Sequence, residues 1–190
     1  MNIACIAWGS LLYKPQPLKL ASGWHPDGPH LPIEFVRQSD DDPELALALC
    51  EGFKPVPTYW AWLATRDLDT ARAMLGEREQ IRPGYPECVG SIPPVDGAEA
   101  DPRIAAWMQR KGIDAVVWTA LPAKFAGASG RAPTSEEAVA WLDSLQGEDR
   151  AKAEDYVRRT PAHIDTRYRR LFEKRLGWRP LRESYVTQRV

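Results

Sequence analysis

The segment IACIAWGSLLYKP, residues 3–15, decides how the start of this chain folds. Its first half is an uninterrupted apolar run with the length of a buried strand, which we expect over residues 3–8. Gly9 and Ser10 then interrupt the run, and Leu11 resumes it. A small, flexible pair at the end of a buried strand indicates a turn, and the question is what that turn is for.

The composition is that of an ordinary globular protein. The chain has 190 residues, of which 44% are apolar and 27% are charged, which suits a single domain over residues 1–190 and excludes a largely disordered chain. No run approaches the roughly 18–20 apolar residues of a membrane span, and no basic region precedes the first apolar stretch. We therefore expect a cytoplasmic protein that has no membrane partner.

Neither a metal site nor a disulfide is expected. Cys5, Cys50 and Cys88 are widely spaced and form no CxxC pattern, so we expect free thiols in a reducing compartment. The histidines form no HxxH or HExxH pattern, which leaves zinc without a recognisable ligand set. Because neither a GxGxxG nor a Walker pattern occurs, no nucleotide cofactor is implied either.

The charge is unevenly distributed, although the net charge is only −1. From Glu148 to the end, 12 basic residues accompany 7 acidic ones. The interspersed acids favour a solvated helix face, and nucleic-acid binding is the alternative. No aromatic stacking platform accompanies the basic residues, so we expect no nucleic-acid partner. The arginines that the alternative would use are Arg158, Arg159, Arg167, Arg169 and Arg170.

Strand patterns dominate the first two thirds of the chain. Two segments joined by SDDDP, residues 39–43, alternate apolar with polar residues and predict an antiparallel pair. Residues 82–101 are rich in proline and glycine and predict mostly loop. The strands expected after the first are residues 33–39, 44–52, 58–65 and 112–122, with a short helix over residues 102–111.

Helical patterns dominate after residue 130. Thr134 is the expected cap of the first helix, Glu137 completes a capping box, and Gly147 is the expected end. Two more helices are expected over residues 148–160 and 162–178.

The order of strands first and helices last is typical of the α+β class. We expect a small mixed β-barrel or curved sheet flanked by helices, with a core over residues 1–125. The C-terminal helices form an expected extension over residues 131–178.

One helix places a carboxylate on its apolar face. The segment DLDTARAMLGEREQ predicts a helix from Asp67, its cap, to Glu79. At 3.6 residues per turn, the stripe of Leu68, Ala71 and Leu75 continues to Glu79, whereas Glu77 is expected to face solvent. Burial would raise the pKa of such a carboxyl towards the range of a general base. The alternative is a frayed helix end, with the carboxylate bonded to Arg78 or Arg82.

Two motifs resemble the gamma-glutamylcyclotransferase superfamily, and its ChaC branch most. AWGSL at residues 7–11 is similar to the family's Gly-Tyr-Gly-Ser-Leu turn after a strand, although Trp8 stands where tyrosine is usual. LGERE at residues 75–79, with GY at 84–85, is similar to the family's Leu-x-x-Arg-Glu helix end and the Gly-Tyr after it. The resemblance covers about residues 3–121.

This resemblance implies a cofactor-free lyase that cyclises the gamma-glutamyl group of a small-molecule amine or peptide to 5-oxoproline. It implies that Glu79 is the general acid and base. It also implies that the Gly-Ser turn receives the gamma-glutamyl group, because consecutive backbone N–H groups in such a turn can hold an anion. A plain turn or bulge is the alternative. The substrate-binding candidates are Trp8, Gly9, Ser10, Leu11 and Tyr85.

Weaker candidates and a second hypothesis remain. Glu34 alternates away from its apolar neighbours and is expected to face solvent. Arg37 is expected in a surface ion pair, or else near a substrate carboxylate. The second hypothesis keeps the fold as a non-catalytic module that binds a small anion. Trp8 in place of the family's tyrosine and the longer loop between Glu79 and Tyr85 support it.

Overall fold

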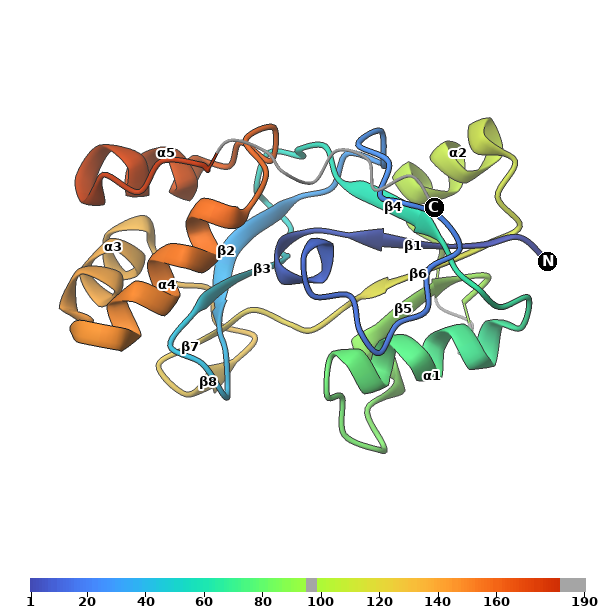
Figure 1. Cartoon of the computed structure of the whole chain (residues 1–190), viewed down its shortest axis with the longest axis horizontal. Helices are drawn as coiled ribbons and strands as arrows, with labels where there is room; N and C mark the ends of the chain where they lie inside the picture. Colours follow the sequence, from blue (N-terminus) through green and yellow to red (C-terminus); the bar gives the residue numbers. More distant parts are fainter. Residues whose placement is uncertain (95–98, 182–190) are drawn as a thin grey trace. The chain divides into compact units, whose positions relative to one another are not determined.

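The computed structural model describes residues 1–94 and 99–181 and belongs to the α+β class, as expected (Figure 1). The described residues form two four-stranded sheets and five α-helices. Neither sheet closes into a barrel within the described ranges, so both are open sheets and the expected barrel is not observed.

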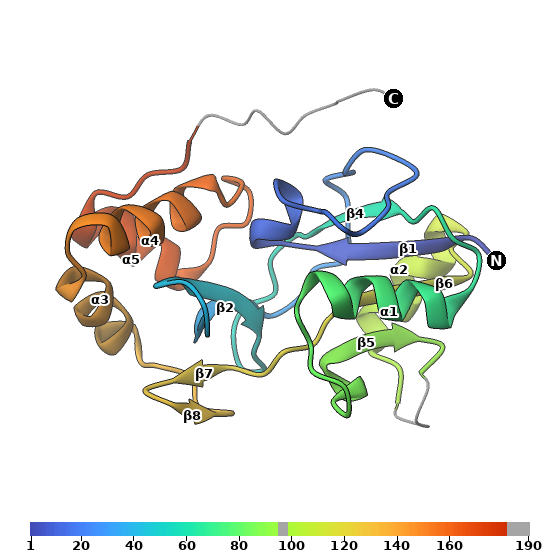
Figure 2. The same cartoon turned by 60° about the horizontal axis from the view of Figure 1, so that its bottom comes forward.

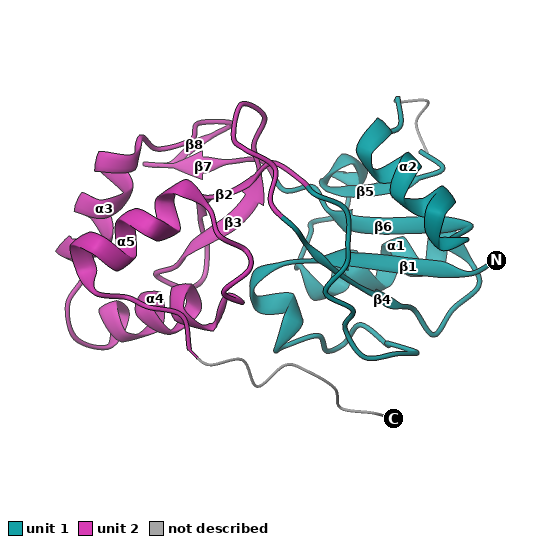
Figure 3. Cartoon of the chain, turned by 90° about the horizontal axis from the view of Figure 1, so that it is seen from above, with its two compact units in different colours: residues 1–30, 57–121, 185–190 teal, residues 31–56, 122–184 magenta. Residues whose placement is uncertain are grey.

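The described residues group into two compact units (Figure 3). The first comprises residues 1–30 and 57–121, and the second comprises residues 31–56 and 122–181. Each unit contains one of the two sheets. The expected core over residues 1–125 and the expected extension over residues 131–178 stay predictions. The second unit combines the strands β2 (Ile33–Gln38) and β3 (Leu45–Leu49) with the last three helices.

The sheet of the first unit has the strand order β4-β1-β6-β5. Strand β1 runs parallel to β6 and antiparallel to β4, and all five of its residues are buried. A central strand covered on both faces must be apolar throughout, which explains the run that opens the chain. The strands are β1 (Ile3–Ala7), β4 (Tyr59–Trp62), β5 (Val89–Ile92) and β6 (Ala115–Thr119).

Helices α1 (Leu68–Arg78) and α2 (Pro102–Lys111) lie on opposite faces of this sheet (Figures 2 and 3). The Asp67 carboxylate accepts a hydrogen bond from the Thr70 N–H at 2.8 Å, so the expected cap of α1 is confirmed. Two short 3-10 helices, η1 (Gly9–Leu12) and η2 (Pro86–Cys88), complete the unit.

The sheet of the second unit has the order β3-β2-β7-β8, and the expected antiparallel pairing of its first two strands is confirmed. Helix α5 packs on β2, and α4 packs on β3. At the centre, the Phe35 ring meets the edges of Phe172 and Tyr156 at centroid distances of 5.5 and 6.3 Å. The elements are β2 (Ile33–Gln38), β3 (Leu45–Leu49), β7 (Lys124–Phe125), β8 (Ala128–Ser129), α3 (Ser135–Ser144), α4 (Gly147–Arg159) and α5 (Arg167–Leu176).

Three sequence predictions about local structure were wrong. The last helix, expected from residue 162, begins only at Arg167, because the Thr166 side chain caps it there. Strand β5 lies inside residues 82–101, where we expected mostly loop, because pairing with β6 outweighs the weak local signal of a four-residue strand that contains glycine. Residues 95–98 of that stretch lie outside the described residues. Gly147 begins α4 instead of ending α3, which stops at Ser144. The capping box of Thr134 and Glu137 is confirmed.

The arginines of the last two helices mostly form local ion pairs. Arg158 pairs with Glu154 and Arg159 with Asp155, each one turn apart on α4. Arg169, which the nucleic-acid alternative placed on the surface, is instead 1% exposed, and its guanidinium donates to backbone carbonyls that include that of Ile164 at 3.0 Å. None of the helices in the described part of the chain has the length and apolar character needed to cross a membrane.

Candidate active site

The turn that interrupts the first apolar run is the 3-10 helix η1, directly after β1. Gly9 has φ = +63°, in the left-handed region, where a residue with a Cβ is strained. Gly9 and Leu11 are buried, Trp8 is 7% exposed, and Ser10 is half-buried. The glycine is therefore required by the backbone of the turn.

Glu79 is the C-terminal cap residue of α1, and its surroundings follow the helix-face prediction. Ala71 and Leu75 are buried, Glu77 is exposed, and the Glu79 side chain is only 16% exposed. The two glutamates at this end of α1 are thus in different environments, as the 3.6-residue period predicts.

Arg78 connects the helix end to the turn. Its guanidinium Nη1 lies 3.2 Å from Glu79 Oε1, its Nη2 donates to Ser10 Oγ at 3.1 Å, and its Nε donates to the Lys14 carbonyl at 2.8 Å. The Arg78 side chain is 14% exposed. One arginine therefore brings together two features that the sequence pattern marks separately, the carboxylate and the Gly-Ser turn.

The charges of Glu79 and Arg78 act on the thiol of Cys5 in β1. Burial raises the pKa of the Cys5 thiol, Glu79 raises it further, and Arg78 offsets part of the rise. The thiol is therefore neutral at physiological pH, and the arrangement does not suit a cysteine nucleophile, which must be a thiolate.

Among the described residues, no hydrogen bond connects the Tyr85 side chain to this cluster. Tyr85 is 54% exposed, and its phenol hydroxyl makes no hydrogen bond within residues 1–94 and 99–181. Arg78 thus connects the Glu79 carboxylate to Ser10, in the turn that also contains Trp8, Gly9 and Leu11.

The pairing of Glu79 with Arg78, which belongs to the alternative of a paired carboxylate at the helix end, is confirmed. Arg78 was missed only as a residue of the site, although the sequence contains a signal for that role too. Counting seven residues from Ala71 along the stripe that includes Leu75 leads to Arg78, one position before Glu79. Two oppositely charged neighbours where an apolar stripe ends indicate an inward-facing ion pair.

The prediction for Glu34 was wrong. Its side chain is 1% exposed, because β2 is buried on both faces over its first four residues and alternation does not separate them. The carboxylate accepts hydrogen bonds from the Thr166 hydroxyl and from the backbone N–H of Tyr168 at 3.1 Å, at the start of α5. Burial raises the pKa of the Glu34 carboxyl, and these hydrogen bonds offset part of the rise.

Arg37, at the end of the same strand, forms an ion pair with Asp40 at 3.2 Å and donates to the Pro122 carbonyl at 2.9 Å. The first of our two expectations for Arg37, a surface ion pair, is therefore confirmed.

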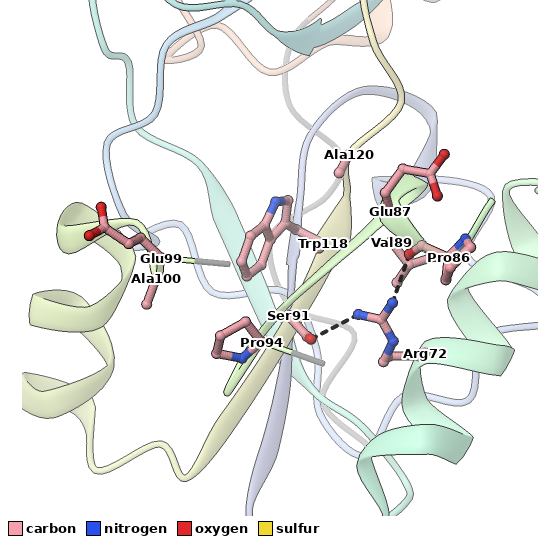
Figure 4. Close-up of a pocket in the computed structure, with 11 residues that line it drawn as sticks. Arg72, Pro86, Glu87, Val89, Ser91, Pro94, Glu99, Ala100, Trp118 and Ala120 are labelled. Carbon is pink, nitrogen blue, oxygen red and sulfur yellow. Dashed lines mark hydrogen bonds between the residues drawn. The ribbon is translucent and has the colours of Figure 1, made fainter. Parts of the chain in front are cut away.

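A cavity of about 250 Å³ opens along the edge strand β5, in the same unit as Glu79 (Figure 4). The Trp118 indole lies over Gly90, where an added Cβ would stand 2.2 Å from the ring. Arg72 of α1 donates to Ser91 Oγ at 2.8 Å and to the Pro86 carbonyl at 2.7 Å. None of the site residues expected from the sequence lines this cavity.

Within the described residues, no three histidine, cysteine, aspartate or glutamate side chains stand close enough together to hold a metal ion. No protein-family model, curated protein or solved structure matches the chain. A function is therefore inferred from the residues of this site and their geometry.

Proposed function

We propose that this chain is a gamma-glutamylcyclotransferase-type lyase on a gamma-glutamylcyclotransferase-like fold. It converts the gamma-glutamyl group of a small amine or peptide to 5-oxoproline, without a cofactor and in the cytoplasm. The observation that carries the proposal is the contact of one guanidinium, that of Arg78, with both Glu79 and Ser10.

The chemistry is an intramolecular aminolysis. The substrate's α-amine nitrogen attacks its own γ-carbonyl carbon, and Glu79 accepts the proton that the amine loses. The bond from that carbon to the leaving nitrogen then breaks, and Glu79 returns the proton to this nitrogen. The products are 5-oxoproline and the free amine, so one carboxylate serves as base and then as acid.

Positioning supplies most of the rate in such a reaction. Because nucleophile and electrophile belong to one molecule, the protein has to fold the substrate into a near-attack geometry. In the proposal the turn at Gly9 does this, since glycine carries no side chain that would block the approach of the substrate to the backbone. The neutral thiol of Cys5 takes no part in the reaction.

Substitution of Glu79 tests the proposal, with Glu77 as a matched control on the same helix end. Release of 5-oxoproline would be measured by chromatography over a panel of gamma-glutamyl amines and peptides, including glutathione. Glu79→Gln should lower turnover by about 100-fold or more, the range for loss of a general acid-base group. Glu77→Gln should match the parent protein, because Glu77 faces solvent. Retained turnover in Glu79→Gln would remove this residue from the mechanism.

One observation favours the alternative of a non-catalytic module that binds a small anion. The Glu79 carboxylate is paired with a guanidinium, so part of its charge is already compensated. Under this alternative, a gamma-glutamyl compound raises the unfolding temperature of the protein, yet no 5-oxoproline forms.

A further inference from the structure

Helix α1 carries two arginines that each bind a serine hydroxyl, and the two serines differ. Arg72 donates to Ser91 Oγ at 2.8 Å, and Ser91 Oγ in turn donates to the Pro93 carbonyl at 3.0 Å (the first contact is drawn in Figure 4). Arg78 donates to Ser10 Oγ at 3.1 Å. A hydroxyl has one hydrogen to donate, so the hydrogen-bonding capacity of Ser91 as a donor is filled.

The hydrogen of Ser10 Oγ has no acceptor in the described part of the chain. The backbone carbonyl of Ser10 is engaged separately, because it accepts from the N–H groups of Tyr13 and Lys14 at 3.2 and 2.8 Å. Ser10 is half-buried, so its hydroxyl remains within reach of a ligand.

The partner of Ser10 Oγ also determines what this hydroxyl can do. A guanidinium donates hydrogen bonds and accepts none, so Arg78 occupies an acceptor position of the hydroxyl and cannot take its proton. A serine nucleophile needs a base at that position, and the pairing therefore argues against an acyl-serine route. Donation from a cation also polarises the hydroxyl and strengthens it as a donor.

We infer that Ser10 is a ligand-contacting hydrogen-bond donor and that Arg78 is the positioning residue that directs it. The inference rests on the proposed function and deepens it: the Ser10 hydroxyl donates to the γ-carbonyl oxygen of the substrate as negative charge develops there. Arg78 acts through Ser10 and Glu79, whose positions it fixes together with that of the Lys14 carbonyl.

A double-mutant cycle tests the inference, using Ser10→Ala, Arg78→Lys and the double variant. Removal of one donor to a developing oxyanion typically lowers kcat by about 100-fold to 1000-fold, and we expect this of Ser10→Ala with KM changing by less than about threefold. Lysine cannot reproduce three contacts in a plane, so Arg78→Lys should lose a similar factor. The double variant should be no slower than the slower single variant, since both substitutions remove the same donor.

The pair Arg72→Lys and Ser91→Ala is the matched control. These substitutions remove the same kind of contact from the same helix, and kcat should stay within about twofold of the parent protein if only the ligand-facing serine matters. Unfolding by urea identifies any variant that loses activity through loss of structure.

If Arg78→Lys fails to fold, Ser10→Ala alone decides the role of the hydroxyl, because this substitution removes a single heavy atom. Full kcat in Ser10→Ala, or losses that multiply in the double variant, would overturn the inference.

Failure of the inference can be told apart from failure of the proposed function. Turnover of any gamma-glutamyl compound by the parent protein supports the function, whatever Ser10→Ala does. If turnover is absent, calorimetric titration with 5-oxoproline and with L-glutamate still measures the contact. Binding weakened about tenfold or more in Ser10→Ala then supports the Ser10 donor, by the usual size of a hydrogen bond to a charged group. A parent protein that neither turns over these compounds nor binds these two probes overturns both.

Discussion

Glu79 in the first unit and Glu34 in the second are both inward-facing carboxylates, yet their surroundings differ. Glu34 is 1% exposed, and its partners are neutral donors: the Thr166 hydroxyl and backbone N–H groups, including its neighbour Phe35 at 2.9 Å. Glu79 is 16% exposed, and it forms an ion pair with the cation of Arg78.

Burial alone therefore does not identify a site. Glu34 connects β2 to the start of α5, where the first N–H groups of a helix need acceptors, so its role is accounted for by the fold. Glu79 shares its guanidinium with a serine whose hydrogen has no acceptor among the described residues. The two carboxylates therefore differ in their neighbours: beside Glu79 lies a serine hydroxyl that can still donate a hydrogen bond to a ligand.

The largest effect on stability should follow truncation of Glu34. Glu34→Ala leaves the Thr166 hydroxyl and two N–H groups buried without an acceptor, and we expect a loss of about 3 kcal/mol in the free energy of unfolding. Urea unfolding measures it. Glu34→Gln keeps an acceptor oxygen and should lose clearly less. A loss below about 1 kcal/mol for Glu34→Ala would mean that water replaces the carboxylate as the acceptor of these donors. Glu34 would then not be needed for the fold, and the contrast with Glu79 would fail.

The next largest effect should be a pH dependence of the free energy of unfolding that comes from Glu34. Because the folded state raises the pKa of this carboxyl above its ordinary value of 4.5, folding favours its protonated form. The resulting stability is fully present below pH 4.5 and is lost as the pH rises through the folded-state pKa. The parent protein should therefore lose stability relative to Glu34→Gln between pH 4.5 and neutrality, which urea unfolding over a pH series measures. A constant difference between the two proteins over this range would contradict the raised pKa.

A methyl group added at Gly9, in the turn connected to Glu79 through Arg78, should lower both stability and activity. Gly9→Ala places a Cβ at φ = +63° and should cost about 1–2 kcal/mol in the free energy of unfolding. Gly112→Ala is the matched control, since Gly112 ends α2 at φ = +65° with open space where the Cβ would be. Both variants should lose similar stability, but only Gly9→Ala should also lose 5-oxoproline release. Equal activity in the two would separate the turn from the site.

The smallest effect on stability should follow truncation of Glu79. Glu79→Ala leaves the Arg78 guanidinium with two further acceptors, so we expect a loss of about 1 kcal/mol, the usual net contribution of one hydrogen bond. Glu77→Ala gives the reference for an exposed position at the same helix end. A loss as large as that of Glu34→Ala would make Glu79 a structural residue and would remove the contrast between the two units.

Sequence patterns predicted those elements whose local signals agree with their environment. The apolar run of β1, the cap at Asp67 and the capping box at Thr134 each appear where expected, because the stabilising contact is encoded within a few residues. Strand β5 was missed because its stability comes from pairing with β6, about 25 residues later in the chain. Single-sequence patterns do not contain that pairing.

The candidate site was predictable in part for the same reason. Helical periodicity is local, so it separated Glu79 from Glu77, and an interrupted apolar run marked the turn at Gly9. Alternation failed at Glu34, because whether a strand is covered on one face or two depends on α5, more than a hundred positions away. The contact between Arg78 and Ser10 spans 68 positions, and only the folded chain reveals it.

The position of β1 has a consequence for protein synthesis. Among the strands that the structure describes, β1 is made before its parallel neighbour β6, which ends at Thr119. The hairpin of β2 and β3, which is made between them, belongs to the unit that contains α3–α5. At translation rates of about 5–20 residues per second, the opening apolar segment waits on the order of ten seconds for that neighbour. A nascent chain therefore exposes this fully apolar strand to chaperones well before the first unit can bury it.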